Sequence, residues 1–245
     1  MLRIVPTTDR PGTTDVSSSE TNSFPEAISA LEKEFALELV DTPESAEEAF
    51  RLRHQVYCLE RGYEPDRGGI EIDEFDVSAR HVLLRRRSTG EVVGTVRLVL
   101  SSPEGIENSF PIQRVCEASL LSDLPIATAA EVSRFAISKQ RRGGNRAGDA
   151  LMRLALIRGV VQLSYEIGVT HWCAVMERTL LRLLQSSGIH FQPLGPLVEY
   201  HGLRQPVAGS LDTILERMKR EQPAIWKFVT AGGSYSKGTP VPLAA

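Results

Sequence analysis

The apolar and polar positions of the chain alternate between short strand-like and longer helix-like segments. Residues 36–41 alternate as in a short strand, and the following DTPES segment supplies helix-start residues, with Thr42 or Ser45 as the cap. Apolar positions at helical spacing then continue to about Glu60, where the Gly-rich loop at 61–69 begins. The start of the folded region is therefore predicted to be a strand followed by a helix.

The remaining pattern predicts a hairpin followed by a crossover unit. Strands are expected at 81–87, 91–100, 131–138 and 171–176, helices at 149–168, 177–188 and about 210–230, and final strands between 191 and 206. Gly188 is the expected C-cap of the amphipathic helix at 177–188. This order of elements predicts an α/β (α+β) fold, in which one mixed central sheet has helices on both faces.

The two ends of the chain differ in composition from its centre. Residues 1–24 are rich in Thr, Ser, Asp, Pro and Gly and predict a disordered N-terminal tail. Residues 233–245 read in the same way and predict a flexible C-terminal tail. The 42% hydrophobic content is typical of a globular protein. We therefore expect a single domain over residues 25–232.

Charge and cysteine content exclude several classes of protein. A formal net charge of −3 gives no sign of a nucleic-acid partner. No apolar run resembles a signal peptide or a membrane span, so we expect a soluble, cytoplasmic protein without a transmembrane segment, for which peripheral membrane contact stays open. Cys58, Cys116 and Cys173 are widely spaced and form no CxxC motif, which argues against a disulfide framework or a structural zinc site.

Charged residues inside two predicted strands are the strongest chemical signal. Arg97 lies in GTVR, and Glu131 and Arg134 lie in EVSRF, within runs that are expected to be buried. Buried charges are costly unless they are paired. Side chains alternate across a sheet, so Glu131 and Arg134 point to opposite faces unless a bulge lies between them. A structural ion-pair network and a catalytic site both remain open.

Two further pairs of residues have the spacing of a site. Arg53 and Tyr57 are four residues apart, on one face of the first predicted helix. Asp73 and Asp76 lie in the acidic segment EIDEFD. Alternatively, the first pair is a helix face packed on the sheet, and the second consists of turn-forming or solvated acids.

The ordered set of these patterns resembles a known superfamily. The segments RLRHQVYCLERGYE, EIDEFD, VVGTVRLV and AEVSRFAI are similar to motifs of the acyl-homoserine-lactone synthases and the long-chain N-acyl amino acid synthases. The residues at 174–206 are most similar to the acyltransferases associated with the exosortase/PEP-CTERM system. The resemblance runs from about residue 37 to 208. Tyr63 stands where the homoserine-lactone synthases usually carry Trp, which argues against S-adenosylmethionine as the acceptor.

The resemblance implies a GNAT-like N-acyltransferase without a metal or a permanently bound cofactor. It implies a fatty acyl donor carried on the 4′-phosphopantetheine of acyl carrier protein or of coenzyme A, and an amino acid or other small amine as acceptor. The implied catalytic residues are Glu131 as the base, with Arg134 and Arg97. The implied substrate-binding residues are Arg53, Tyr57, Tyr63, Asp73, Asp76 and Phe135. Candidate walls of an acyl tunnel are Val99, Phe110, Phe135, Leu151, Leu154, Val175 and Leu184.

The loop RRGGNRAG precedes a predicted helix, where free N–H groups and the helix dipole favour a phosphate. Arg141, Arg142, Gly144 and Arg146 are therefore candidate residues for binding the cofactor phosphate. Several of these side chains also form a basic surface that suits an acidic carrier protein. A solvated basic face is the alternative.

Two other functions compete with acyl transfer from a long-chain donor. One is a non-catalytic sensor that binds acyl chains or acyl carrier protein, and the intact Glu131 and Arg134 argue against it. The other is an N-acetyltransferase dependent on acetyl-coenzyme A.

Overall fold

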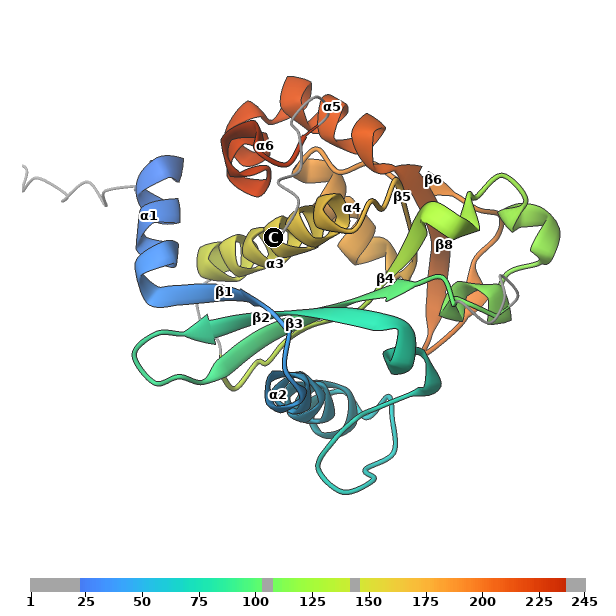
Figure 1. The fold of residues 1–245 in the computed structure, drawn as a ribbon, viewed down its shortest axis with the longest axis horizontal. Helices are drawn as coiled ribbons and strands as arrows, with labels where there is room; N and C mark the ends of the chain where they lie inside the picture. The colour runs from blue at the N-terminus through green and yellow to red at the C-terminus, as the bar shows by residue number, and fades with distance from the viewer. Residues whose placement is uncertain (1–22, 103–107, 142–145, 237–245) are drawn as a thin grey trace, which may run out of the picture.

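The computed structural model describes residues 23–102, 108–141 and 146–236, which fold around one mixed sheet (Figure 1). The strands are β1 Phe35–Leu39, β2 Ala79–Arg86, β3 Val92–Leu100, β4 Ala129–Ile137, β5 His171–Met176, β6 Gln192–Pro193, β7 Val198–Glu199 and β8 Leu203–Ser210. They form an eight-stranded sheet in the order β1-β2-β3-β4-β5-β8-β6, with β7 paired to β8. The predicted mixed α/β sheet is confirmed.

Helices cover both faces of this sheet, as predicted (Figure 1). The α-helices are α1 Phe24–Glu34, α2 Pro43–Arg53, α3 Arg146–Glu166, α4 Arg178–Ser186, α5 Leu211–Glu221 and α6 Pro223–Val229. A π-helical segment at His54–Glu60 extends α2. Short 3₁₀ turns lie at Glu74–Ser78, Pro111–Arg114, Ala118–Leu121, Ile126–Thr128 and Ala231–Gly233. Helix α2 lies on the opposite face of the sheet from α3 (Figure 1).

The main hydrophobic core lies between the sheet and α3. Its members include Val82 and Val96 from the strands and Leu156 and Val160 from the helix. Helix α3 approaches β2 closely at Gly159, where a Cβ atom would lie 2.4 Å from Val82 Cγ1. A smaller core on the other face gathers Phe75, Val99, Phe110, Ile112 and Cys173 beneath the acidic segment. The two cores hold the charged residues of β3 and β4 in a buried setting.

Three boundaries differ from those predicted. Helix α1 begins at Phe24, where Ser23 forms a capping box with Glu26, so ordered structure starts inside the predicted 1–24 tail. The expected helix at 210–230 is two helices, because Pro223 lacks an N–H and its ring prevents α5 from continuing. Gly233 belongs to a 3₁₀ turn within the predicted C-terminal tail. Residues 1–22 and 237–245 lie outside the described residues.

Strand β4 has different partners along its length. It pairs antiparallel with β3, and it pairs parallel with β5 only from Ala129 to Glu131. Strand β5 meanwhile continues to Met176 beside β8. From Val132 to Ile137, the β5-facing edge of β4 therefore has no strand partner in the described part of the chain. This divergence of two neighbouring strands opens the space in which the site lies.

Within the residues that the structure describes, no helix has the length and apolar character needed to cross a membrane.

Candidate active site

A bulge in β4 turns the side chain of Arg134 toward the acidic segment. Between β3 and β4, Thr95 pairs with Ala136 and Arg97 pairs with Ser133. Strand β4 therefore has one residue more than β3 between these two pairs, which is a β-bulge. Arg134 has a φ of +49° at this point, in the left-handed region that non-glycine residues rarely adopt. The bulge that the sequence left open between Glu131 and Arg134 is present, and it brings Arg134 and Arg97 to the same group of carboxylates.

Arg53, the last residue of α2, joins this helix to the acidic segment EIDEFD. Its Nη1 and Nη2 donate to the two carboxylate oxygens of Asp76 at 2.6 Å and 2.9 Å, and its Nε donates to Glu71 at 2.5 Å. The Arg53 side chain is fully buried. Burial alone would raise the pKa of Asp76, but the hydrogen bonds and charges of Arg53 and the charge of Arg97 hold that pKa well below its usual value.

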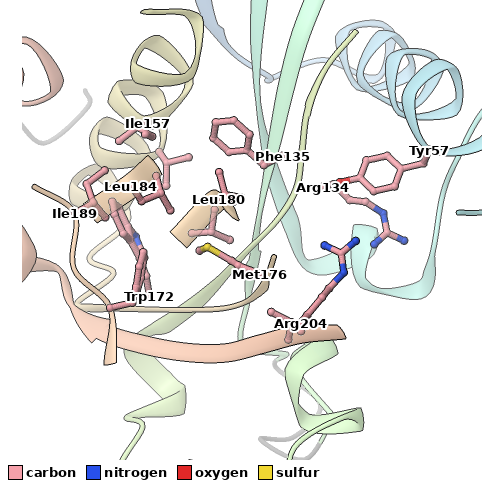
Figure 2. Close-up of a pocket in the computed structure, with 14 residues that line it drawn as sticks. Tyr57, Arg134, Phe135, Ile157, Trp172, Met176, Leu180, Leu184, Ile189 and Arg204 are labelled. Atoms are coloured by element: carbon pink, nitrogen blue, oxygen red, sulfur yellow. The ribbon is translucent and has the colours of Figure 1, made fainter. Parts of the chain in front are cut away.

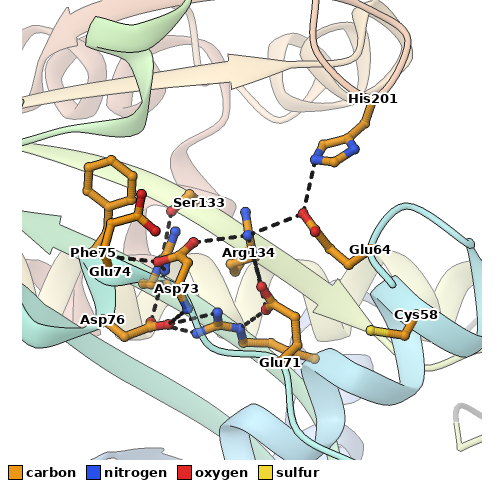
Figure 3. Close-up of polar contacts among 12 residues, drawn as sticks. Cys58, Glu64, Glu71, Asp73, Glu74, Phe75, Asp76, Ser133, Arg134 and His201 are labelled. Atoms are coloured by element: carbon orange, nitrogen blue, oxygen red, sulfur yellow. Dashed lines mark hydrogen bonds and ion pairs between the residues drawn. The ribbon is translucent and has the colours of Figure 1, made fainter. Parts of the chain in front are cut away.

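Arg97 and Arg134 complete the cluster from the sheet, and Figure 3 shows Arg134 joined to Glu71 and Asp73. Arg97 Nη1 donates to Asp73 at 2.5 Å and to Asp76 at 2.9 Å, and its Nε donates to Ser133 Oγ at 3.1 Å. Arg134 Nη2 donates to Glu71 at 2.9 Å and to Asp73 at 3.0 Å. Three guanidinium groups therefore share three carboxylates. The structure brings together Arg53, Asp73, Asp76, Arg97 and Arg134, all of which the sequence predicted as site residues.

Glu131 is a buried residue of β4. It is 2% exposed, and its Oε2 accepts a hydrogen bond from the N–H of Ile112 at 2.7 Å. Burial raises the pKa of Glu131 to about 8, against the opposing effects of this hydrogen bond and of the charges on Arg97 and Arg134. A carboxyl with this pKa can exchange a proton near neutral pH, as a general base must.

An apolar pocket occupies the space between the diverging strands (Figure 2). It has a volume of about 110 Å³ and is lined by Tyr57, Val132, Arg134, Phe135, Ile157, Val160, Trp172, Val175, Met176, Leu180, Leu184, Ile189, Phe191 and Arg204. Figure 2 places Tyr57, Arg134 and Arg204 at one end, and Ile157, Leu184, Ile189 and Trp172 at the other. The pocket is therefore polar at its mouth and apolar at its far end.

The seven residues predicted as tunnel walls lie in three places. Phe135, Val175 and Leu184 line the apolar pocket. Val99 and Phe110 belong to the smaller core on the opposite face of the sheet, and Leu151 and Leu154 lie in or against the main core. Hydrophobic patterning cannot separate a pocket wall from an ordinary core position, because both are apolar and buried.

Two clefts adjoin the apolar pocket. The polar cleft is lined by Glu64, Pro65, Arg67, Ile70, Glu71, Ile72, Asp73, Glu74, Phe75, Pro111, Arg114, Arg134 and Tyr200. The edge cleft follows the unpaired edge of β4 and is lined by Val56, Tyr57, Arg61, Tyr63, Phe135, Ala136, Ile137, Arg153, Glu177, Thr179, Leu180, Leu183 and Arg204. Arg134 lines both the apolar pocket and the polar cleft, and Tyr57 lines both the apolar pocket and the edge cleft.

Tyr63 lies in a polar cluster that the sequence did not reveal. Its hydroxyl donates to Glu177 at 3.3 Å, its ring stacks on His201 with centroids 5.4 Å apart, and the Arg204 guanidinium lies 5.4 Å from its ring centroid. His201 Nε2 in turn lies 3.2 Å from Glu64. The segment before β8 thus reaches the loop that follows α2 and its π-helical extension. No sequence motif marked Arg204 or Glu177.

Glu71 is the third site residue that the sequence analysis did not single out. It binds both Arg53 and Arg134, and although burial would raise its pKa, these two arginines lower that pKa below its ordinary value. Its position at the start of the acidic segment EIDEFD was the feature of the sequence that could have identified it as a site residue.

The π-helical segment places Tyr57 beside Arg134, with the guanidinium carbon 5.3 Å from the ring centroid. At the end of this segment, Glu60 accepts hydrogen bonds from Ser138 Oγ at 2.6 Å and from the N–H of Lys139 at 2.9 Å. These bonds attach the segment to the end of β4. Short π-helical segments are frequent at functional sites.

The predicted phosphate loop is described only at its edges. Arg141 Nη1 donates to the carbonyl of Val92 at 2.9 Å, and its Nε lies 3.3 Å from Glu91. Arg142, Gly144 and the side chain of Arg146 lie outside the described residues, so the phosphate site stays a prediction. Across the described part of the chain, no group of three or more His, Cys, Asp or Glu residues could hold a metal ion.

Comparison with known proteins relates this geometry to acyltransferases. The family described as an acetyltransferase (GNAT) domain matches residues 52–152. The isovaleryl-homoserine lactone synthase of Bradyrhizobium diazoefficiens is 29% identical over 157 residues, which cover 61% of this chain and 64% of that protein. The match thus spans less than two thirds of this relative's length.

Solved structures share the fold at low sequence identity. The acyl-homoserine-lactone synthase LasI aligns with a TM-score of 0.54 and 22% identity, over 71% of this chain and 87% of its own. FeeM, an N-acyl amino acid synthase from uncultured soil microbes, aligns with a TM-score of 0.56 and 17% identity, over 75% and 93%. MesI, a CoA-dependent acyl-homoserine lactone synthase, aligns with a TM-score of 0.55 and 23% identity, over 76% and 94%.

The narrower likeness to the exosortase-associated acyltransferases stays a prediction. The GNAT-like fold is confirmed, and in sequence this chain is similar to an acyl-homoserine-lactone synthase.

Proposed function

We propose that this chain is an N-acyltransferase that moves a fatty acyl group from a 4′-phosphopantetheine thioester to the amine of an amino acid or a similar small amine. The observation that carries this proposal is the meeting of an apolar pocket, a strand-edge cleft and a charged cleft around Tyr57 and Arg134. The three spaces suit an acyl chain, a pantetheine arm and a polar acceptor.

The donor arm fits the edge cleft. Pantetheine carries two amide groups, and the edge of β4 beyond Val132 offers backbone N–H and C=O groups that have no strand partner among the described residues. Acyl carrier protein is the donor and protein partner that the sequence resemblance favours. Coenzyme A is the alternative, since MesI is described as CoA-dependent. Either donor places the reaction in the cytoplasm.

The acceptor fits the polar cleft. Its walls carry both signs of charge, with Glu64 and Glu74 opposite in charge to Arg67 and Arg114. A zwitterionic amino acid presents an ammonium group and a carboxylate that match such walls. Tyr63 lies outside this cleft, in the edge cleft.

Aminolysis requires a neutral amine that attacks the thioester carbonyl. The C–N bond forms as the carbonyl π electrons move to oxygen, and the C–S bond breaks when the intermediate collapses. The proton lost by the amine nitrogen balances the proton gained by the leaving thiolate. We assign Glu131 as the base. Its side chain lines none of the three spaces, so it acts through a water, and its raised pKa suits proton transfer. Arg134 and Arg97 orient the acidic segment beside it.

Release of free thiol tests the proposal. The purified protein is incubated with long-chain acyl carrier protein, long-chain acyl-coenzyme A or acetyl-coenzyme A, each with and without a mixture of amino acids. Thiol release from a long-chain donor that depends on the amino acids supports the proposal and identifies the carrier. Release only from acetyl-coenzyme A would indicate an N-acetyltransferase. Binding of long-chain donors without release would indicate a sensor.

A further inference from the structure

The apolar pocket and the edge cleft share four residues. These are Tyr57, Phe135, Leu180 and Arg204. In an acyl donor, the thioester carbonyl joins the acyl chain to the pantetheine arm, so it must lie where these two spaces meet. Among the four side chains, only those of Tyr57 and Arg204 can donate a hydrogen bond.

Each of these two side chains has a hydrogen-bond donor that has no acceptor among the described residues. Arg204 Nε donates to the carbonyl of Tyr200 at 2.5 Å, and its Nη2 lies 3.3 Å from the carbonyl of His201 and 3.4 Å from Glu177. Neither Arg204 Nη1 nor the Tyr57 hydroxyl has an acceptor within the described residues. The side chain of Arg204 is only 14% exposed, so its position is set by these contacts.

The charges at the mouth of the pocket also favour an anionic oxygen. Arg134 is balanced by Glu71 and Asp73. Among the described residues, the acidic partner of Arg204 is Glu177, at 3.4 Å, and this carboxylate also accepts from Tyr63. Figure 2 shows the Arg204 guanidinium at the same end of the pocket as Tyr57 and Arg134.

We infer that Arg204 and the Tyr57 hydroxyl form the oxyanion site of the acyl-transfer reaction. This inference rests on the proposed function. The two side chains donate hydrogen bonds to the thioester carbonyl oxygen, and these bonds strengthen as the attack of the amine turns that oxygen into an oxyanion. When the intermediate collapses, the electron pair returns from oxygen to carbon and the thiolate leaves. Neither side chain gains or loses a proton.

The two residues of the proposed oxyanion site come from distant regions of the chain. Tyr57 belongs to the π-helical segment and Arg204 to β8, 147 positions later, so the oxyanion site exists only in the folded protein. It also gives a reason for the contacts around Tyr63. The Tyr63 ring and Glu177 hold Arg204 from two sides.

The test compares turnover with binding. The variants Arg204→Gln, Arg204→Lys and Tyr57→Phe are purified, and kcat is measured with the best long-chain donor of the wild type. The dissociation constant is measured separately for the matching S-alkyl thioether, which has the chain and the pantetheine arm but no thioester carbonyl. Arg217→Gln, an exposed change in α5 that removes a contact with Glu221, is the matched control.

Loss of an oxyanion donor is expected to lower kcat about 10²-fold in Arg204→Gln. Affinity for the thioether should stay unchanged. Arg204→Lys should recover part of the loss, because it restores a cationic donor, and Tyr57→Phe should lower kcat without a change in thioether affinity. Arg217→Gln should match the wild type.

Two outcomes would overturn the inference while leaving the proposed function intact. One is unchanged kcat in the folded Arg204 and Tyr57 variants. The other is a loss of thioether affinity as large as the loss of kcat, which would mean that the two residues only shape the pocket. A wild type that is inactive with every donor would instead contradict the proposed function itself. Tyr57→Phe removes one hydroxyl and keeps the ring, so it decides the question if Arg204→Gln does not fold.

Discussion

Arg53 donates two parallel hydrogen bonds to Asp76 across 23 residues of sequence, at 2.6 Å and 2.9 Å. This contact joins the end of α2 to the acidic segment, and Arg97 donates to the same carboxylate from β3 at 2.9 Å. Three separate elements therefore depend on one carboxyl group. Because the pKa of Asp76 is held well below its usual value, the group stays ionised throughout the neutral range.

We predict that Asp76→Asn destabilises the protein by about 3–5 kcal/mol, because it removes the shared negative charge and leaves buried Arg53 and Arg97 undercompensated. Urea unfolding followed by circular dichroism measures this change. Glu47→Gln is the control, since it breaks the pair with Arg51, in which both side chains are more than half exposed. Such a pair contributes less than about 1 kcal/mol. Equal effects of the two changes would contradict the account of the cluster.

We predict that Glu131→Gln folds and lowers turnover by about 10²-fold or more. The Gln carbonyl can still accept the N–H of Ile112, so the fold is kept, but the amide cannot take up a proton. Turnover of the wild type should rise as the pH rises through about 8, where the Glu131 carboxyl ionises. Turnover of a folded Glu131→Gln variant that equals the wild type would exclude Glu131 as the base.

The same carboxyl predicts an opposite trend in stability. Its pKa is about 8 in the folded protein, against an ordinary value of 4.5, so between these values the folded protein binds more protons than the unfolded chain. The contribution of Glu131 to the free energy of unfolding is therefore fully present below pH 4.5 and is lost as the pH rises through 8. Relative to Glu131→Gln, the wild type should become less stable over this range. Parallel stability profiles of the two proteins would show that the pKa is not raised.

We predict that Gly159→Ala destabilises the protein by about 1–3 kcal/mol, because the new Cβ would overlap Val82 Cγ1 at 2.4 Å. The β-branched Val82 side chain has little freedom to move away. Gly148→Ala in the same helix is the matched control, since its Cβ would meet nothing within 4 Å. This control should gain up to about 1 kcal/mol from helix propensity. Thermal unfolding compares the two, and a stabilised Gly159→Ala protein would contradict the packing described.

We predict that Leu184→Phe shifts donor preference toward shorter acyl chains. Leu184 lies at the end of the apolar pocket away from Arg134 and Arg204 (Figure 2). Each buried CH₂ contributes about 0.8 kcal/mol, so a shortened pocket should change the ratio of kcat/KM values between donors that differ by two carbons. Gln185→Phe is an exposed change in the same helix that lines neither this pocket nor the two clefts, and it should keep the wild-type ratio. An unchanged ratio in Leu184→Phe would mean that the chain is held elsewhere.

The main strands could be predicted from the sequence because they follow from patterns within single segments. The strand predicted at 171–176 matches β5. Alternation placed Glu131 and Arg134 on opposite faces unless a bulge lay between them, and the φ of +49° at Arg134 and the register shift show that bulge. The positive φ of Gly188, +81°, agrees with the predicted helix end.

Contacts between distant segments could not be predicted in this way. Arg204 approaches Tyr63 because β8 pairs with β5 and β7, and no local pattern in the chain encodes that arrangement. The π-helical segment has the same apolar spacing as an ordinary helix end, so periodicity does not reveal it. Glu71 was visible in its motif, but its two arginine partners come from different elements.

Mass spectrometry of organic extracts from cells that express this protein tests the central claim most directly, with cells expressing Glu131→Gln as the control. The account predicts an N-acyl amino acid that appears only with the wild type, and its mass identifies the acyl chain and the acceptor together. The absence of any new acylated amine, from cells that contain the soluble and folded wild type together with long-chain acyl donors and amino acids, would contradict the proposed acyl transfer.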